Sequence, residues 1–79
     1  MYAIITVDET MDIQCGNITS SQDKAKKWYN DYKLRMIKAN NQDFKVELNE
    51  WVSKDGRDRC MEVKINGRFY ELMKVCKRP

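Results

Sequence analysis

Residues 44–76 read FKVELNEWVSKDGRDRCMEVKINGRFYELMKVC and contain the two strongest turn signals in the chain. Asn66-Gly67 separates two runs in which apolar and polar residues alternate, and Asp55-Gly56 lies one run earlier. Both dipeptides favour a type I′ hairpin turn, because the two central residues of that turn need a positive φ. The stretch therefore predicts three antiparallel strands that follow one another along the chain.

The two turns also predict the register of these strands. Residues directly opposite each other in neighbouring strands share a face of the sheet. Counting outward from the two turns places these residues on one face: Val46, Leu48, Met61, Val63, Ile65, Tyr70 and Leu72. A wider loop over 53–58 keeps this assignment if it keeps the same parity, whereas a one-residue slip would invert every side chain.

The opposite face of the three strands is predicted to carry apolar side chains among charged ones. The apolar members are Trp51, Phe69, Met73 and Val75. Two interpretations stay open: a loop, a terminus or a helix covers this face, or the face is a contact surface for a second copy or another protein. We favour the contact surface, because 79 residues offer little else to cover it.

The N-terminal part of the chain predicts a second hairpin. Residues 2–7 are mostly apolar, residues 11–15 alternate, and a three-residue turn over 8–10 pairs Val7 with Met11. Gly16-Asn17 is predicted to end the second of these strands. The predicted buried face of the hairpin holds Ala3, Ile5, Val7, Met11, Ile13 and Cys15. Its other face is also half apolar, which predicts that the first strand lies inside the sheet.

A helix is predicted from about residue 21 to residue 38 or 39, before Asn40-Asn41. Ser20 followed by Asp23 fits the start of a helix. One stripe at helical spacing is expected to pack on the sheet: Ala25, Trp28, Tyr29, Tyr32, Met36 and Ala39. The order β-β-α-β-β-β then predicts an α+β fold, a two-layer sandwich with a single helix packed on one face of one antiparallel sheet.

Length and composition restrict the classes of protein that fit. Seventy-nine residues make one domain, 1–79, and we find neither a leader-like start nor an apolar run of membrane-spanning length. We therefore expect a cytoplasmic protein without a membrane partner. Three cysteines and no histidine give neither a disulfide framework nor a Cys/His zinc spacing. We expect no metal, no cofactor and no small-molecule ligand.

The usual signs of catalysis are missing from the sequence. Without histidine the most common general base is lacking, and the three glycines are explained by turns or strand breaks. Glu62 and Glu71 are predicted to be neighbours across two strands, where two carboxylates can share a proton. We expect them to be solvated or neutralised by Lys64, and we expect the protein not to be an enzyme.

The charge is distributed unevenly along the chain. Residues 1–23 hold four acids and no Lys or Arg, whereas residues 24–79 hold 15 basic and eight acidic residues. Such polarity bears on association rather than on fold. Direct binding of RNA or DNA is one function that it suggests, through an exposed helix face and the ends of the strands. The candidate residues are Lys24, Lys27, Arg35, Lys38, Arg57, Arg59 and Arg68.

Protein binding is the function that we favour over nucleic-acid binding. The predicted face with Trp51 and Phe69 has the aromatic character of an interface core, and it could also support a homodimer. Leu34 is predicted to lie among lysines on the outward face of the helix, where a partner could contact it. The residues expected to contact a protein are Trp51, Phe69, Met73, Val75 and Leu34.

No motif in the chain matches a known family. In its size and its β-β-α-β-β-β order, the chain is similar to the small inhibitors that phages encode against host defence systems, including some anti-CRISPR proteins. No individual residue carries this likeness. It implies a non-catalytic inhibitor that docks on a host protein that handles nucleic acid.

Overall fold

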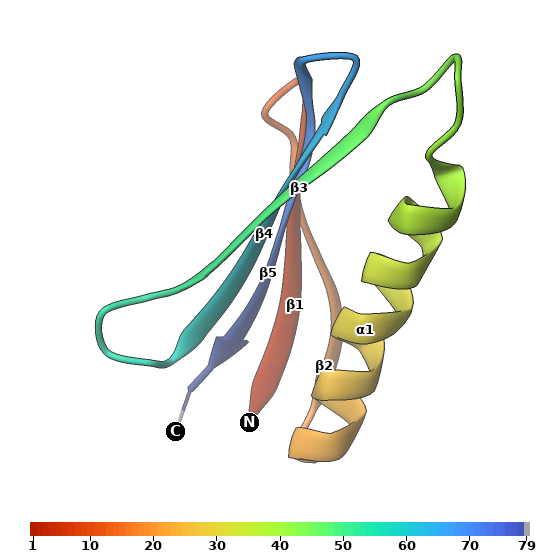
Figure 1. Ribbon diagram of the computed structural model, residues 1–79. Coiled ribbons are helices and arrows are strands. Elements are labelled where there is room, and N and C mark those ends of the chain that lie inside the picture. The colour runs from red at the N-terminus through yellow and green to blue at the C-terminus, as the bar shows by residue number, and fades with distance from the viewer. Residues whose placement is uncertain (79) are drawn as a thin grey trace.

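The computed structural model describes residues 1–78 and shows one antiparallel sheet with a helix on one face (Figure 1). The elements are β1 (Tyr2–Asp8), β2 (Ile13–Thr19), α1 (Gln22–Ala39), β3 (Val46–Val52), β4 (Asp58–Ile65) and β5 (Arg68–Lys77). The strands lie in the order β2-β1-β5-β4-β3, so that β1 is inside the sheet and the N-terminal and C-terminal strands are neighbours. The predicted α+β two-layer fold is confirmed.

The pairing of β3 with β4 is the one predicted. Leu48 lies opposite Val63. The connection between the two strands is the wider loop of 53–57, which keeps the predicted parity. At the next turn, Asn66 and Gly67 have φ values of 53° and 78°, as a type I′ turn requires. Local turn chemistry therefore determines this part of the sheet.

The predicted pairing of β4 with β5 is wrong beyond the first two residue pairs. Lys64 lies opposite Phe69, but Val63 lies opposite Glu71, because a β-bulge takes up Tyr70 as an extra residue. A one-residue shift exchanges the two faces of the rest of the strand. Met73 and Val75 consequently face α1 and are buried, at 1% and 8% exposure, while Leu72 faces away from the helix.

The first hairpin also differs from its prediction. Val7 pairs with Ile13 rather than with Met11, and the turn is longer. Gly16 does not end β2 but lies within it, beside an irregularity in the pairing of the two strands. The face that was expected to be buried points away from α1, whereas Ile4 on the other face packs against the core. The residues that share a face were predicted correctly, but the prediction of which face the helix covers was wrong.

The helix has the predicted length, and both its first residue and its N-cap lie one residue later than predicted. Ser21, not Ser20, is the N-cap, and its hydroxyl accepts a hydrogen bond from the backbone N–H of Lys24. The predicted stripe packs on the sheet as expected at its centre but not at Ala39, which is exposed. The buried apolar core consists of Ala25, Tyr29, Tyr32, Met61, Val63, Met73 and Val75.

Candidate functional site

The sheet face opposite α1 carries a broad apolar area over β2, β1 and β5. The pairing places its members in adjacent rows, which we call the apolar outer surface: Ala3, Ile5, Val7, Ile13, Cys15, Ile18 and Leu72. On the edge strand β2, Ile13 is 68% exposed and Ile18 is 59% exposed. Within residues 1–78, α1 is the only helix and it lies on the other side of the sheet. This surface is therefore open to a partner.

The other half of the outer face is charged. Glu62 on β4 lies in the same row as Leu72, and Lys64 lies opposite Phe69. Lys74 separates Ile5 from Cys60 in the central row, and its ammonium group lies 4.0 Å from the carboxylate of Asp58. The apolar outer surface is consequently bounded by charge on one side and by the free edge of β2 on the other.

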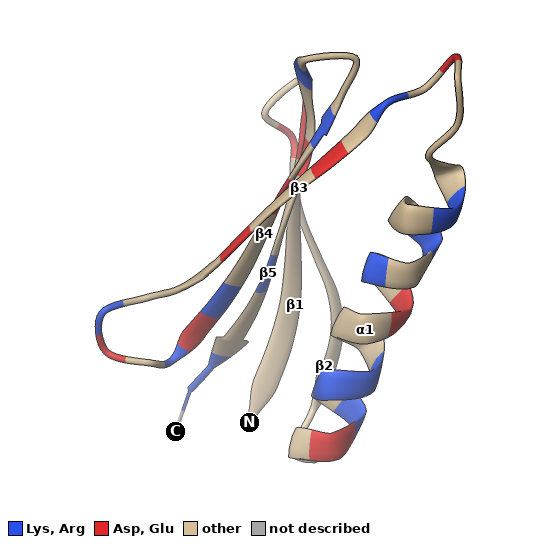
Figure 2. Ribbon diagram, viewed as in Figure 1, with Lys and Arg blue, Asp and Glu red and all other residues tan. Residues whose placement is uncertain are grey.

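Acidic side chains lie at the hairpin between β1 and β2. The Asp8 carboxylate accepts hydrogen bonds from the Thr10 hydroxyl at 2.6 Å and from the Asp12 N–H at 3.0 Å. The Thr10 hydroxyl is the main reason that the pKa of Asp8 is lowered, which keeps the carboxylate ionised. Glu9 and Asp12 are exposed beside it. Figure 2 shows that β1 and β2 carry no basic residue, so the charge beside the apolar outer surface on this side is negative.

The residues predicted to contact a protein do not form one group. Trp51 and Phe69 lie on the outer face as predicted, but they are four ladder positions apart along β4. Met73 and Val75 are core residues and are not available to a partner. The β-bulge that reverses the second half of β5 is the reason. Leu34 is 53% exposed on α1, in the layer opposite the apolar outer surface.

A second site lies between the first half of α1 and the end of the sheet where the chain termini meet. Four basic side chains line it, and we call it the basic cleft: Lys26, Arg57, Arg59 and Lys77. Its volume is about 180 Å³, and its remaining walls are formed by Tyr2, Gln22, Ala25, Tyr29, Gly56 and Val75. No carboxylate among the described residues lines it.

Backbone pairing and stacking position the basic side chains. The backbone N–H of Lys77 donates a hydrogen bond to the carbonyl of Arg57 at 2.9 Å, which joins the loop before β4 to the end of β5. The guanidinium of Arg59 lies 4.4 Å from the centroid of the Tyr29 ring, on the helix side of the sheet. These contacts bring cations from two strands and the helix to the same cleft.

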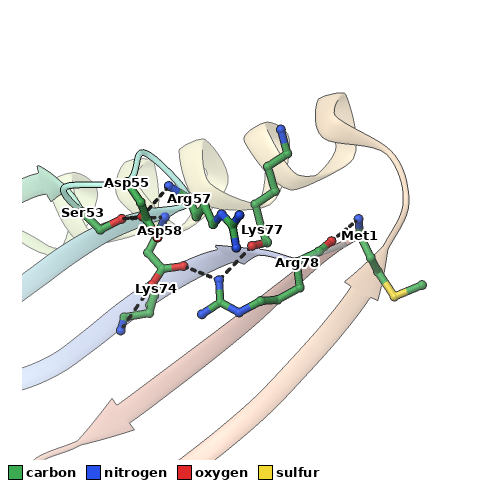
Figure 3. Close-up of polar contacts among 8 residues, drawn as sticks. All are labelled: Met1, Ser53, Asp55, Arg57, Asp58, Lys74, Lys77 and Arg78. Atoms are coloured by element: carbon green, nitrogen blue, oxygen red, sulfur yellow. Dashed lines mark hydrogen bonds and ion pairs between the residues drawn. The ribbon is translucent and has the colours of Figure 1, made fainter.

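The nearby acids are engaged elsewhere (Figure 3). Asp58 pairs with the guanidinium of Arg78 at 2.9 Å and with Lys74 on the outer face. Asp55 accepts hydrogen bonds from the Ser53 hydroxyl at 2.6 Å and from the Arg57 N–H at 3.0 Å. Among residues 1–78, no carboxylate lies within 4.0 Å of the charged group of any of the four side chains, and Asp55 and Glu50 attract Arg57 and Arg59 only at longer range.

The residues predicted to bind nucleic acid are divided among three places. Arg57 and Arg59 belong to the basic cleft. Arg68 lies beside the Asn66-Gly67 turn, at the opposite end of β4. Arg35 is 5.6 Å from the centroid of the Tyr32 ring. The remaining three are exposed on α1: Lys24, Lys27 and Lys38.

Glu62 and Glu71 are not the carboxylate pair that the sequence predicts. The β-bulge places Glu62 on the outer face and Glu71 on the helix face, opposite Val63. There the hydroxyl of Tyr32 donates a hydrogen bond to Glu71. The meeting of Lys26 with Lys77 in the basic cleft was not predicted either. Their spacing in the sequence does not indicate this contact, because Lys26 lies on the helix and Lys77 lies on the sheet.

Comparison with family models, with curated proteins and with solved structures found no match to this chain. None of the described residues forms a helix that is long and apolar enough to cross a membrane. The two surfaces themselves are therefore the basis on which a function is inferred.

Proposed function

We propose that this is a non-catalytic binding protein that docks on another protein through the apolar outer surface. Its mode of action would be that of a small phage-type inhibitor of a host protein that defends the cell or handles nucleic acid. The observation that carries the proposal is the sheet itself. One face is covered by α1, and the other exposes isoleucines at 68% and 59% on an edge strand. Burying one such side chain on association is worth about 1.5–3 kcal/mol.

Charge indicates the kind of partner. The hairpin that joins β1 and β2 carries Asp8, Glu9 and Asp12 and no Lys or Arg. An apolar surface with acids at one end is complementary to an apolar surface with basic residues at the corresponding end. Basic surfaces are typical of proteins that bind nucleic acid. We therefore infer a nucleic-acid-handling protein as the partner, and its basic surface as the docking site.

The compartment in which the protein acts belongs to the same proposal. Cys15, Cys60 and Cys76 are all unpaired, although Cys15 is exposed. An exposed free thiol persists in a reducing compartment. This supports action in the cytoplasm.

The test is affinity capture from nuclease-treated host lysate at low and moderate salt, with identification of the captured protein and reconstitution from the purified pair. The Ile13→Glu/Ile18→Glu variant should lose capture, because it places carboxylates in the apolar outer surface. Leu34→Glu is the matched control, since Leu34 is similarly exposed, at 53%, but lies on α1. We expect Leu34→Glu to retain capture of a partner with a basic surface. We expect added salt to weaken this capture.

Two outcomes would contradict this assignment. Equal capture by wild type and the Ile13→Glu/Ile18→Glu variant would show that the apolar outer surface is not the docking site. Light scattering that finds a dimeric wild type and a monomeric variant would identify a second copy of the chain as the occupant instead.

Direct binding of RNA or DNA is the second candidate function. The observation that favours it is the convergence of Arg57 and Arg59 with Lys26 and Lys77 in the basic cleft. An oligonucleotide that binds more weakly as salt rises would support it. Lys27→Glu/Lys38→Glu tests the exposed helix face, and Arg57→Glu/Lys77→Glu tests the cleft. No loss of binding in either variant would exclude both sites.

A further inference from the structure

We propose that the basic cleft is a specific binding site for the phosphate monoester of a nucleotide. This proposal deepens the second candidate function and does not rest on the apolar outer surface. The cleft is a hollow of about 180 Å³ that is lined by four cations and by no carboxylate of residues 1–78.

The fold brings the four cations to one cleft. A backbone hydrogen bond places Lys77 beside Arg57, and stacking holds the guanidinium of Arg59 over the Tyr29 ring. Like charges repel one another, and an anion that lies between them relieves this repulsion. In Figure 3 the side chain of Lys77 extends toward α1, whereas that of Arg78 turns away to Asp58. The charge of Lys77 is therefore directed into the cleft.

The amount of charge favours a monoester over a backbone diester. A diester carries one negative charge, whereas a monoester carries about −1.5 to −2 near neutral pH because its second pKa is about 6. Arginine guanidinium groups bind such oxygens in pairs, and lysines add point charge. A cleft with four cations is matched best by the ligand group with the higher charge.

The size and the walls of the cleft favour a nucleotide. A volume of about 180 Å³ has room for one phosphate group and the carbon to which it is attached. The attached sugar and base would then lie at the mouth of the cleft. Tyr2, which is half-buried, contributes an aromatic ring to the wall of the cleft. Aromatic rings of this kind stack on bases regardless of their sequence.

The experiment is a calorimetric titration of the protein with inorganic phosphate, adenosine 5′-monophosphate and adenosine. We expect the monophosphate to bind more tightly than inorganic phosphate, and adenosine not to bind measurably. Arg57→Gln/Lys77→Gln should weaken binding of the monophosphate by about ten-fold or more, since it removes two charge-assisted contacts. Lys45→Gln/Lys64→Gln is the matched control, because it removes the same charge from two exposed residues outside the cleft and should leave the affinity unchanged.

The pH dependence of the affinity for the monophosphate provides an independent test. Binding should weaken as the pH falls below about 6, where the monoester takes up its second proton. The chain contains no histidine, the side chain that ordinarily titrates in this window. Dimethyl phosphate, which has no second ionisation, should show no such change.

The phosphate monoester could belong to a free nucleotide or to the end of a nucleic-acid strand. Short oligonucleotides with either a 5′-phosphate or a 5′-hydroxyl distinguish the two. Tighter binding of the phosphorylated strand than of the free monophosphate assigns the site to the end of a strand, and the reverse order assigns it to a free nucleotide. The proposal is overturned if adenosine or inorganic phosphate binds as tightly as the monophosphate, if the cleft variant matches its control, or if a phosphoserine peptide binds more tightly. The Ile13→Glu/Ile18→Glu variant should keep its affinity for the monophosphate, which separates this proposal from protein docking.

Discussion

The hydroxyl of Tyr29 on α1 donates a hydrogen bond to the carboxylate of Glu50 on β3 over 2.6 Å. The same carboxylate accepts a hydrogen bond from Lys33, one turn further along the helix, at 2.8 Å. Because β3 is an edge strand, this pair of contacts ties the helix to the far side of the sheet. Tyr32 makes the equivalent bond to Glu71 on β5. Two tyrosine hydroxyls thus fix how the two layers lie on each other, and burial is the main reason that the pKa of each is raised.

Removing the Tyr29 hydroxyl tests how much this contact stabilises the fold. Tyr29→Phe keeps the buried ring but loses the bond to Glu50, which remains accessible to water. We expect a loss of about 1 kcal/mol in the free energy of unfolding, measured by urea titration. Tyr70→Phe is the control because Tyr70 is 41% exposed, and it should change stability little. Equal effects of the two substitutions would contradict the role assigned to the bond.

The Glu50 carboxylate makes stability depend on pH. Lys33 is the main reason that the pKa of Glu50 is lowered, and Tyr29 contributes next. A carboxyl with a lower pKa in the folded state adds stability that is present above its unfolded pKa of about 4.3 and is lost as the pH falls through the folded value. Between about pH 6 and pH 3 the wild type should therefore lose more stability than Glu50→Gln does. Urea titrations at each pH measure this, and parallel curves for the two proteins would refute it.

The β-bulge in β5 predicts that truncating two adjacent residues lowers the free energy of unfolding by different amounts. Met73 is 1% exposed in the core, whereas Leu72 is half-buried on the outer face. Met73→Ala should cost about 2–4 kcal/mol because it leaves a cavity, and Leu72→Ala about 1 kcal/mol. Thermal and urea unfolding of the two variants give the comparison. A regular hairpin without the bulge would reverse the order, so a larger cost at Leu72 would show that the register is wrong.

The positive φ of Met11 predicts a stabilising substitution. Met11 has a φ of 66° and is 71% exposed at the end of the first hairpin. Glycine adopts this conformation without steric cost, so Met11→Gly should raise the free energy of unfolding by about 0.5 kcal/mol after the greater entropy of the unfolded chain is included. A clear loss of stability would mean that the Met11 side chain makes contacts that this reasoning omits.

Asn66 is the matching position where glycine should not help. Its φ is 53°, but its side chain accepts a hydrogen bond from the Lys45 N–H at 2.9 Å and donates one to the Asp43 carbonyl at 3.0 Å. Asn66→Gly should therefore lower stability by about 1 kcal/mol in the same urea titration. An unchanged midpoint would show that these two bonds contribute little.

Local patterns in the sequence were enough to determine several parts of this protein. Asn66-Gly67 specified a tight turn because few dipeptides accept two positive φ values, and the alternation on either side of 53–58 specified the register of β3 with β4. Helical spacing specified the stripe that includes Tyr29 and Tyr32. In each case the physical cause acts over a few residues, so it is visible in the sequence.

The tertiary structure decided which faces are free. The bulge at Tyr70 lets Met73 and Val75, rather than Leu72, fill the space beneath the helix, and apolar residues alone do not reveal which of two alternating sets will be covered. The basic cleft likewise exists only because Lys26 comes from the helix while Arg57 and Lys77 come from the end of the sheet. Such a meeting depends on how one layer packs on another, and this packing is a property of the whole fold that no local pattern contains.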